Sequence, residues 1–161
     1  MLETERCKLL DLKHIDFIEI KKLYINHDVR KYLGGIVDEA DLKKAAEFML
    51  KNEGESHFWV VRERISNAFM GLVSLTPHHD GEYTEVSYQF MPSWWGKGYG
   101  REVVGVVIKY GLKELHLSKI IAETQTANKA SCRLLESAGM EREKTLIRFG
   151  AEQALYSIER R

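Results

Sequence analysis

The stretch with the clearest chemical potential is a glycine-rich run that lies between an expected strand and an expected helix, Trp95-Gly96-Lys97-Gly98-Tyr99-Gly100-Arg101. Glycine leaves room for a ligand to approach the backbone. The amides of a helix N-terminus point outward with the positive end of the helix dipole behind them. The run therefore predicts a cradle for a pyrophosphate, to which Lys97 and Arg101 could add charge. The same spacing also fits a glycine-rich turn that binds nothing and whose two cations are solvated.

Other phosphate-binding motifs fit this sequence poorly. The run is not followed by the Gly-Lys-Ser/Thr of a Walker loop, and the chain lacks the repeated parallel units of a dinucleotide fold. Lys plus Arg equal Asp plus Glu at 24 each, so the formal net charge is zero. Zero net charge disfavours a nucleic-acid partner, and a phosphate-bearing ligand must then be held by local geometry.

The glycine-rich run resembles a motif of a known family. The consensus Gln/Arg-x-x-Gly-x-Gly/Ala of the GNAT acetyltransferases matches residues 95–100, with Trp95 in place of the first Gln or Arg. Downstream, residues 128–140 resemble the second block of the family, Asn-x-x-Ser/Ala followed by a helix and a glycine stop. Upstream, Glu5-Arg6 and residues 28–35 are similar to the opening of the branch that includes the ribosomal-protein N-terminal acetyltransferases (RimJ/RimL-like).

This resemblance implies a co-substrate and a substrate class. Acetyl-CoA would supply the acetyl group, and a primary amine, on a small molecule or at a protein N-terminus, would receive it by direct transfer. In similar proteins the fourth and fifth strands splay apart around the pantetheine arm, and here these strands would be residues 84–91 and 119–124. The implied cofactor-binding residues are Tyr88, Gln89, Phe90, Met91, Trp95, Gly96, Lys97, Gly98, Tyr99, Gly100, Arg101, Asn128 and Ser131.

Amine acetylation needs one group that removes the proton of the amine and another that protonates the departing thiolate. Glu85 shares a strand face with Ser87 and Gln89, and a glutamate in this position takes the proton of the amine in similar enzymes. Ser131 begins a helix at a position where a hydroxyl donates to the leaving sulfur in similar enzymes. The alternatives are an exposed strand glutamate and an ordinary first-turn serine. Leu135 stands where many relatives carry a tyrosine acid.

The remaining polar candidates have plainer interpretations. Asn128 fits a cofactor contact, because its amide can donate and accept, but it also fits a helix cap. His78 and His79 lie in a turn and are expected to be solvated. Cys7 and Cys132 are far apart and match no metal spacing, so we expect free thiols and no metal site.

The apolar periodicity predicts one mixed α/β domain over residues 1–161. We expect a sheet of about seven strands, antiparallel except for one splayed parallel pair, with helices on both faces. Strands are expected at 6–12, 58–64, 69–76, 84–91, 119–124, 143–149 and 153–159. Helices are expected at 15–25, from the N-cap Asp38 to Lys51, at 100–115 and at 129–137. The Asn26-His27-Asp28 cluster is expected to end the first helix.

The N-terminus lacks the basic start and apolar run of a signal peptide, and no segment has the roughly 18 apolar residues of a membrane span. We therefore expect a cytoplasmic protein without a membrane partner, as a monomer or a homodimer. The groove for the amine is expected to form from residues 26–35 and 149–153. Two alternatives to an enzyme stay open: a non-catalytic acyl-CoA-binding module, and an interaction domain without a small ligand.

Overall fold

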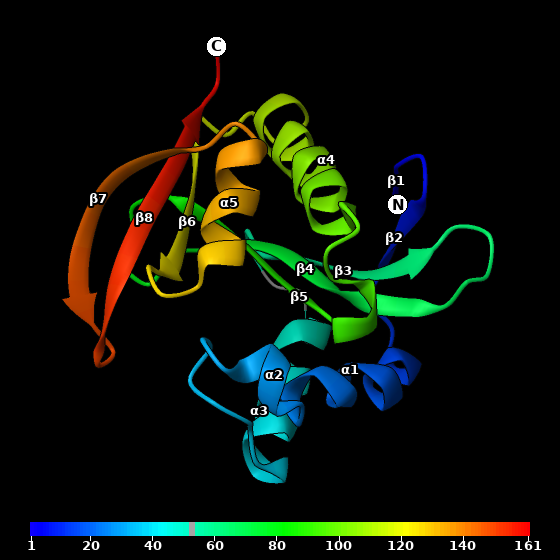
Figure 1. Ribbon diagram of the computed structural model, residues 1–161. Helices are drawn as coiled ribbons and strands as arrows, with labels where there is room; N and C mark the ends of the chain where they lie inside the picture. Colours follow the sequence, from blue (N-terminus) through cyan, green and yellow to red (C-terminus); the bar gives the residue numbers. More distant parts are fainter. Residues whose placement is uncertain (52–53) are drawn as a thin grey trace.

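The computed structural model describes residues 1–51 and 54–161, and within them eight strands form one sheet (Figure 1). The spatial order is β1-β2-β3-β4-β5-β6-β8-β7. The strands are β1 (Leu2–Glu3), β2 (Cys7–Asp11), β3 (His57–Glu63), β4 (Phe69–Pro77), β5 (Thr84–Phe90), β6 (Lys119–Gln125), β7 (Glu141–Arg148) and β8 (Ala151–Glu159). The seven strands expected from the sequence are all present, and the short β1 at the sheet edge is an addition.

The parallel pair of β5 and β6 is very short. All other neighbours in the sheet run antiparallel, whereas β5 and β6 pair in parallel through Thr84↔Ile120 and Glu85↔Ile121. Among the residues that the structure describes, β5 and β6 have no paired partners beyond Glu85, and β6, β8 and β7 curve away from β5 (Figure 1). The sheet therefore splits into two halves between the two strands that the family resemblance implied would splay apart.

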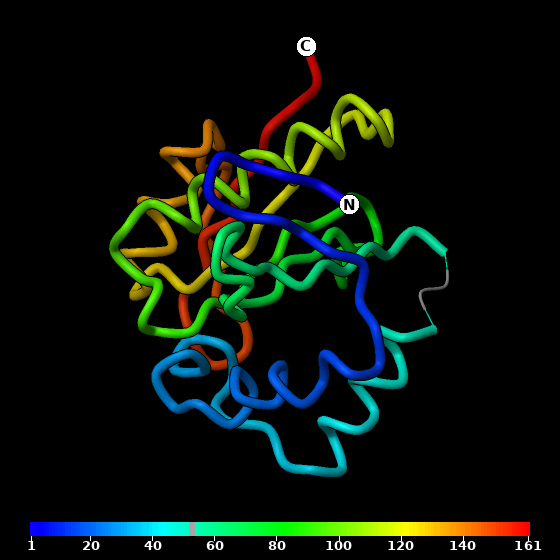
Figure 2. The backbone as a smooth tube through the Cα atoms, turned by 90° about the vertical axis from the view of Figure 1, so that its right-hand side faces the viewer, coloured from blue at the N-terminus to red at the C-terminus, as the bar shows by residue number. Residues whose placement is uncertain are grey.

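Helices cover both faces of this sheet. The helices α1 (Phe17–Tyr24), α2 (His27–Arg30) and α3 (Glu39–Lys51) lie on one face, and α4 (Tyr99–Lys113) and α5 (Lys129–Ser137) lie on the other (Figures 1 and 2). Alternation along the strands separates the two cores. Val60 and Leu72 pack under the N-terminal helices, whereas Val61 and Val73 pack under α4.

Local capping explains where several helices begin. The Asp38 carboxylate accepts the Asp41 backbone N–H at 2.8 Å, which confirms the expected cap of α3. Asn26 likewise accepts the Val29 N–H at 3.0 Å, so the cluster that ends α1 also starts α2. Helix α2 was not predicted from the sequence, because a helix of four residues shows no periodicity. Among the described residues no helix combines the length and apolar character needed to cross a bilayer.

Candidate active site

The glycine-rich run forms the turn into α4. Gly96 and Gly98 have positive φ of 73° and 83°, a region that favours glycine. Gly98 is the N-cap, and the first helical bond, from the Glu102 N–H to the Gly98 carbonyl, is 3.1 Å long. The amides of residues 99–101 come before that bond, so they have no helical partner and are available to an anion.

The glycines of this turn differ in how much space surrounds them. A Cβ on Gly96 would meet no atom within 4 Å, so that position is open. A Cβ on Gly100 would come within 2.5 Å of the Leu134 side chain, so Gly100 is needed for the packing of α4 on α5. The sequence suggested that all three glycines leave room for a ligand, but Gly100 is packed against α5 and Gly96 is open.

Arg6, next to β2, braces the same turn. Its guanidinium donates to the Lys97 carbonyl at 3.1 Å and to the Glu102 carboxylate at 2.9 Å, and it lies 4.0 Å from the centre of the Tyr99 ring. A residue 91 positions away in the sequence thus fixes the carbonyl side of the turn while leaving the amide side free. Lys97 and Arg101 are solvent-facing, and Trp95 donates its indole N–H to the Phe90 carbonyl at 2.8 Å.

Two hydroxyl groups meet across the mouth of the splay. Tyr88 of β5 and Ser131 of α5 approach to 2.6 Å through Oη and Oγ. Burial raises the pKa of Tyr88 to about 12, although its bond to Ser131 opposes the rise. Tyr88 therefore keeps its proton at every physiological pH. Asn128 caps α5 by accepting the Ser131 backbone N–H at 3.2 Å, so its side-chain amide nitrogen stays available to a ligand.

Glu85 lies on the face of β5 opposite to Tyr88, and it is the last residue of β5 that pairs with β6. Its Oε2 accepts the Glu123 backbone N–H at 3.2 Å, and among the described residues its Oε1 has no hydrogen-bond partner. Burial raises the pKa of the Glu85 carboxyl, and the Glu123 charge adds to this, whereas His78, Arg148 and the Glu123 amide oppose it. The result is a carboxylate of increased basicity with one free oxygen.

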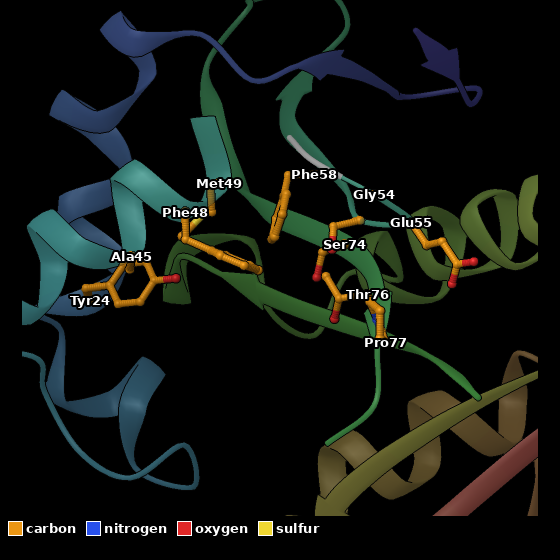
Figure 3. Close-up of a pocket in the computed structure, with 11 residues that line it drawn as sticks. Tyr24, Ala45, Phe48, Met49, Gly54, Glu55, Phe58, Ser74, Thr76 and Pro77 are labelled. Carbon is orange, nitrogen blue, oxygen red and sulfur yellow. The ribbon is translucent and has the colours of Figure 1, made fainter. Parts of the chain in front are cut away.

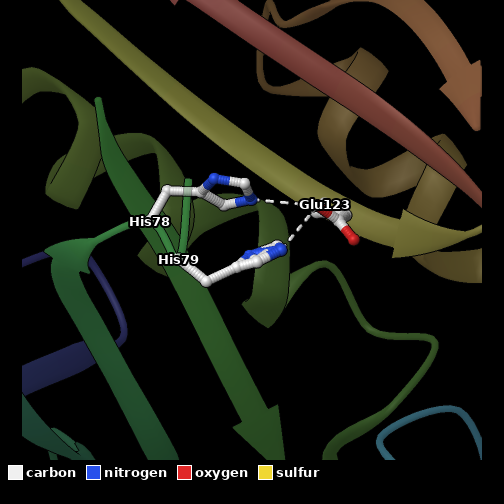
Figure 4. Close-up of side chains that lie close together, drawn as sticks. All are labelled: His78, His79 and Glu123. Atoms are coloured by element: carbon white, nitrogen blue, oxygen red, sulfur yellow. Dashed lines mark hydrogen bonds and ion pairs between the residues drawn. The ribbon is translucent and has the colours of Figure 1, made fainter. Parts of the chain in front are cut away.

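Glu123 of β6, in contrast, is fully engaged. Its carboxylate receives Arg148 Nε at 3.0 Å and Nη2 at 2.9 Å, and His78 Nε2 lies 2.9 Å from Oε1 (Figure 4). The His79 ring approaches the same oxygen at 3.6 Å. The Glu123 side chain is only 6% exposed. Glu123 therefore has neither the free oxygen nor the access that a base needs.

The expectation that His78 and His79 are both solvated is wrong for His78. The His78 side chain is 1% exposed, and its Nδ1 accepts the Asp80 backbone N–H at 3.2 Å. Because Nδ1 accepts, the neutral ring carries its hydrogen on Nε2 and donates it to Glu123. The partner lies 45 residues away on a strand that pairs with β5, and sequence proximity does not reveal such a contact.

The two histidines and Glu123 could in principle group around a metal ion, since their ligand atoms lie within 4.8 Å of one another. The Arg148 guanidinium, however, already occupies both oxygens of Glu123 and also binds Asp80 at 3.0 and 3.2 Å. A cation would have to displace this positive charge. The donor set therefore fits an ion-pair cluster better than a metal centre.

Residues 6–141 match the model of the acetyltransferase (GNAT) domain family. The chain belongs to the GNAT family. The protein YnaD of Bacillus subtilis (strain 168), described as an uncharacterized N-acetyltransferase, is 30% identical to this chain over 145 residues, 88% of this chain and 83% of YnaD. This chain is accordingly an acetyl-CoA-dependent N-acetyltransferase, and the enzyme class expected from the two sequence blocks is confirmed.

Two solved GNAT structures show the same fold. The spermidine N-acetyltransferase from Vibrio cholerae, in complex with CoA and spermine, superposes with a TM-score of 0.83 at 20% identity, over 96% of this chain and 95% of that one. The ribosomal-protein-S5-alanine acetyltransferase from Vibrio fischeri gives 0.79 at 19% identity, over 98% and 95%. These two structures confirm the GNAT fold that was expected from the sequence.

The segment expected to border the amine groove of this GNAT enzyme does lie beside the splayed strands. Arg30 of α2 donates to the Gly35 carbonyl at 3.0 Å, to the Leu33 carbonyl at 2.7 Å and to the Gln89 side chain of β5 at 3.3 Å. Gln125 of β6 donates to the Tyr32 carbonyl at 3.2 Å. On the opposite side, Phe149 in the β7–β8 turn packs on His79, with ring centres 5.4 Å apart.

Proposed function

We propose that this enzyme transfers the acetyl group of acetyl-CoA directly to a primary amine, with Glu85 as the general base. The observation that carries the proposal is the position of Glu85 at the point where β5 and β6 separate, with one free carboxylate oxygen and a pKa raised by burial. A protonated amine cannot attack a thioester, so a nearby acceptor for its proton is the first requirement.

The reaction has a balanced proton path. The amine loses a proton to Glu85, directly or through water, and its nitrogen forms a bond to the thioester carbonyl carbon. The carbon–sulfur bond breaks as the nitrogen gives up its second proton to water, and the departing thiolate takes a proton from Ser131, which is reprotonated from solvent. Tyr88 supports this step, because its O–H can donate to Ser131 Oγ at 2.6 Å and leave the serine hydrogen free for the sulfur. A covalent route through Cys7 or Cys132 has no support, since both thiols are buried.

The proposed cofactor path follows the free backbone groups. The amides from Gly96 to Arg101 would hold the pyrophosphate at the N-terminus of α4. The edge of β5 from Tyr88 to Met91 has no strand on its β6 side, so it can pair with the pantetheine amides. Asn128, at the start of α5, would hold the cofactor from the far side of the splay. Trp95 and Lys97 fit a supporting role, because their side chains donate to backbone carbonyls, Trp95 to Phe90 at the end of β5 and Lys97 to Ser93.

The test is turnover by a Glu85→Gln variant on an amine panel with a free-thiol readout. The variant keeps the shape of the side chain and removes its basicity, so kcat should fall on the order of 10²-fold or more. The KM for acetyl-CoA should stay unchanged, because Glu85 lies on the strand face opposite to Tyr88 and Ser131. The rising limb of the pH–rate profile should also change.

A Glu123→Gln variant is the companion test: it should keep far more turnover than Glu85→Gln, although its rising limb also shifts, because the Glu123 charge contributes to the raised pKa of Glu85. Wild-type turnover and an unaltered limb in Glu85→Gln would remove Glu85 from the role of base. Binding of CoA without release of free thiol on every amine of the panel would instead favour the non-catalytic module.

A further inference from the structure

We propose that the acceptor amine carries an aromatic or bulky apolar body, which binds in a cavity between the N-terminal helices and the sheet. This inference rests on the proposed function and names the substrate class of the same site. The cavity has a volume of about 740 Å³, in the range of small-molecule sites. It is lined from α1, α3, residues 54–56 before β3, β3 and β4 (Figure 3), and none of its lining residues belongs to the glycine-rich turn.

The sheet register places this cavity beside the proposed base. Thr76, which lines the cavity, lies directly opposite Glu85 in the β4–β5 ladder, and Ser74 lies opposite Ser87. Directly opposite residues point to the same face, with Cβ atoms about 5 Å apart. The cavity and the Glu85 carboxyl are therefore on one face of the sheet and one strand apart. An amine at Glu85 can place its body over Thr76 and Ser74.

The side chains that line the cavity favour an aromatic or apolar group on the acceptor amine. Three rings surround it, and two of them, Phe48 and Phe58, meet edge to face with centres 6.1 Å apart at 84° (Figure 3). The third ring belongs to Tyr24. Phe48 is 62% exposed although it is a large apolar side chain, so its ring is available for contact with an apolar ligand.

The charges around the cavity narrow the class further. In the part of the chain that the structure describes, Glu55 is the one charged residue lining the cavity, and the others there are apolar or carry hydroxyls. An acceptor with a carboxylate or phosphate on its body would meet this carboxylate, while the Arg30 guanidinium, 5.2 Å from the centre of the Tyr24 ring, already donates to the Leu33 and Gly35 carbonyls and to Gln89. A polyamine would find a single carboxylate for several charges. The lining therefore fits an arylalkyl primary amine best.

The experiment compares 2-phenylethylamine, ethanolamine and spermidine as acceptors for the full chain, with free thiol as the readout. The proposal expects 2-phenylethylamine to have the highest kcat/KM. Phe48→Ala should raise its KM about tenfold or more, because an apolar pocket discriminates by contact area. The KM values for ethanolamine and acetyl-CoA should stay the same. Ile65→Ala is the matched control, since Ile65 is a 97% exposed apolar residue in the distant β3–β4 turn.

A second variant fills the cavity instead of widening it. Ala45→Trp, on the half-buried side of α3, should abolish the preference for 2-phenylethylamine while ethanolamine is still acetylated. A preference for spermidine, or equal responses of all acceptors to Phe48→Ala, would overturn the proposal while the acetyltransferase assignment stands. Failure of every amine to release thiol would contradict the proposed function itself.

Discussion

The two hydroxyl groups of Tyr88 and Ser131 make the sharpest prediction at the scale of single residues. If Ser131 protonates the thiolate and Tyr88 orients it, Ser131→Ala should lower kcat on the order of 10²-fold. Tyr88→Phe should lower kcat less, because the serine proton remains but loses its orientation. The double variant should be little worse than Ser131→Ala alone, since both groups serve one proton transfer.

A purely structural role for this hydroxyl pair would give a different pattern. Loss of a buried hydrogen bond costs about 1 kcal/mol of stability and leaves kcat of the folded enzyme unchanged. Thermal denaturation of the three variants beside their steady-state kinetics separates the two roles. Additive losses in kcat, or effects confined to the melting temperature, would contradict the proton path.

The sequence predicted the chemistry of single residues unevenly. Strand alternation and a family block predicted roles for Glu85 and Ser131, and the structure places both residues beside the splay. The partners that tune them, Tyr88, His78 and Arg148, were missed as side chains. Each acts through a contact more than 20 residues away in sequence, such as the 2.9 Å contact of Arg148 with Glu123. Nothing in local residue types signals a contact that only strand pairing creates.

At the scale of elements, the turn into α4 allows a prediction about the affinity for CoA. Gly98→Val should raise the Kd for CoA about tenfold or more, because a branched side chain at φ 83° is strained and its Cβ would lie 3.4 Å from the Arg6 guanidinium that braces the turn. Isothermal titration calorimetry with CoA measures the effect. Gly105→Val in the same helix is the control, since a Cβ there meets no atom within 4 Å. Unchanged affinity in a folded Gly98→Val variant would place the cradle elsewhere.

Elements of this protein were predictable wherever the pattern was long and strictly periodic. The helix α4 and the strands β3 to β6 fall within a few residues of their expected bounds, because their apolar residues repeat at 3.6 or 2. The short α2 and β1 were missed, since four and two residues carry no period. The cavity over β4 was missed for another reason. It is formed by packing of α3 against the sheet, and no sequence motif marks it.

At the scale of the whole molecule, the split sheet connects activity to stability. The splay leaves the edge of β5 unpaired beyond Glu85, and this free edge is what a cofactor can use. Glu85 itself is buried with a raised pKa, so its ionised form costs folding free energy at neutral pH. A group retained at such a cost is typical of an active site that sacrifices stability for function.

This cost yields a prediction about the pH dependence of unfolding. Because the pKa of Glu85 is raised on folding, its contribution to stability is full below the ordinary value of 4.5 and is lost as the pH rises through the folded pKa. Glu85→Gln has no charge to bury. It should therefore gain free energy of unfolding relative to the wild type as the pH rises above about 4.5, and the gain should vanish in acid.

Glu102 provides a control of opposite sign. Burial alone would raise its pKa, but hydrogen bonds from Thr4 and Arg6 outweigh burial and hold the pKa of Glu102 below 4.5. Its contribution to stability is present above 4.5 and is lost as the pH falls through the folded pKa. Glu102→Gln should therefore be less stable than the wild type at neutral pH, and the difference should disappear in acid.

Urea denaturation of the wild type and both variants from pH 3.5 to 7.5 measures these differences through the free energy of unfolding. The difference in unfolding free energy between variant and wild type should rise with pH for Glu85→Gln and fall with pH for Glu102→Gln. Ionisation of Glu85 destabilises the folded state, whereas ionisation of Glu102 stabilises it. A flat difference for Glu85→Gln would mean that the Glu85 carboxyl is as well solvated in the folded chain as in the unfolded one. Burial would then not be the source of its basicity, and the base assignment would lose its physical support even if the variant were inactive.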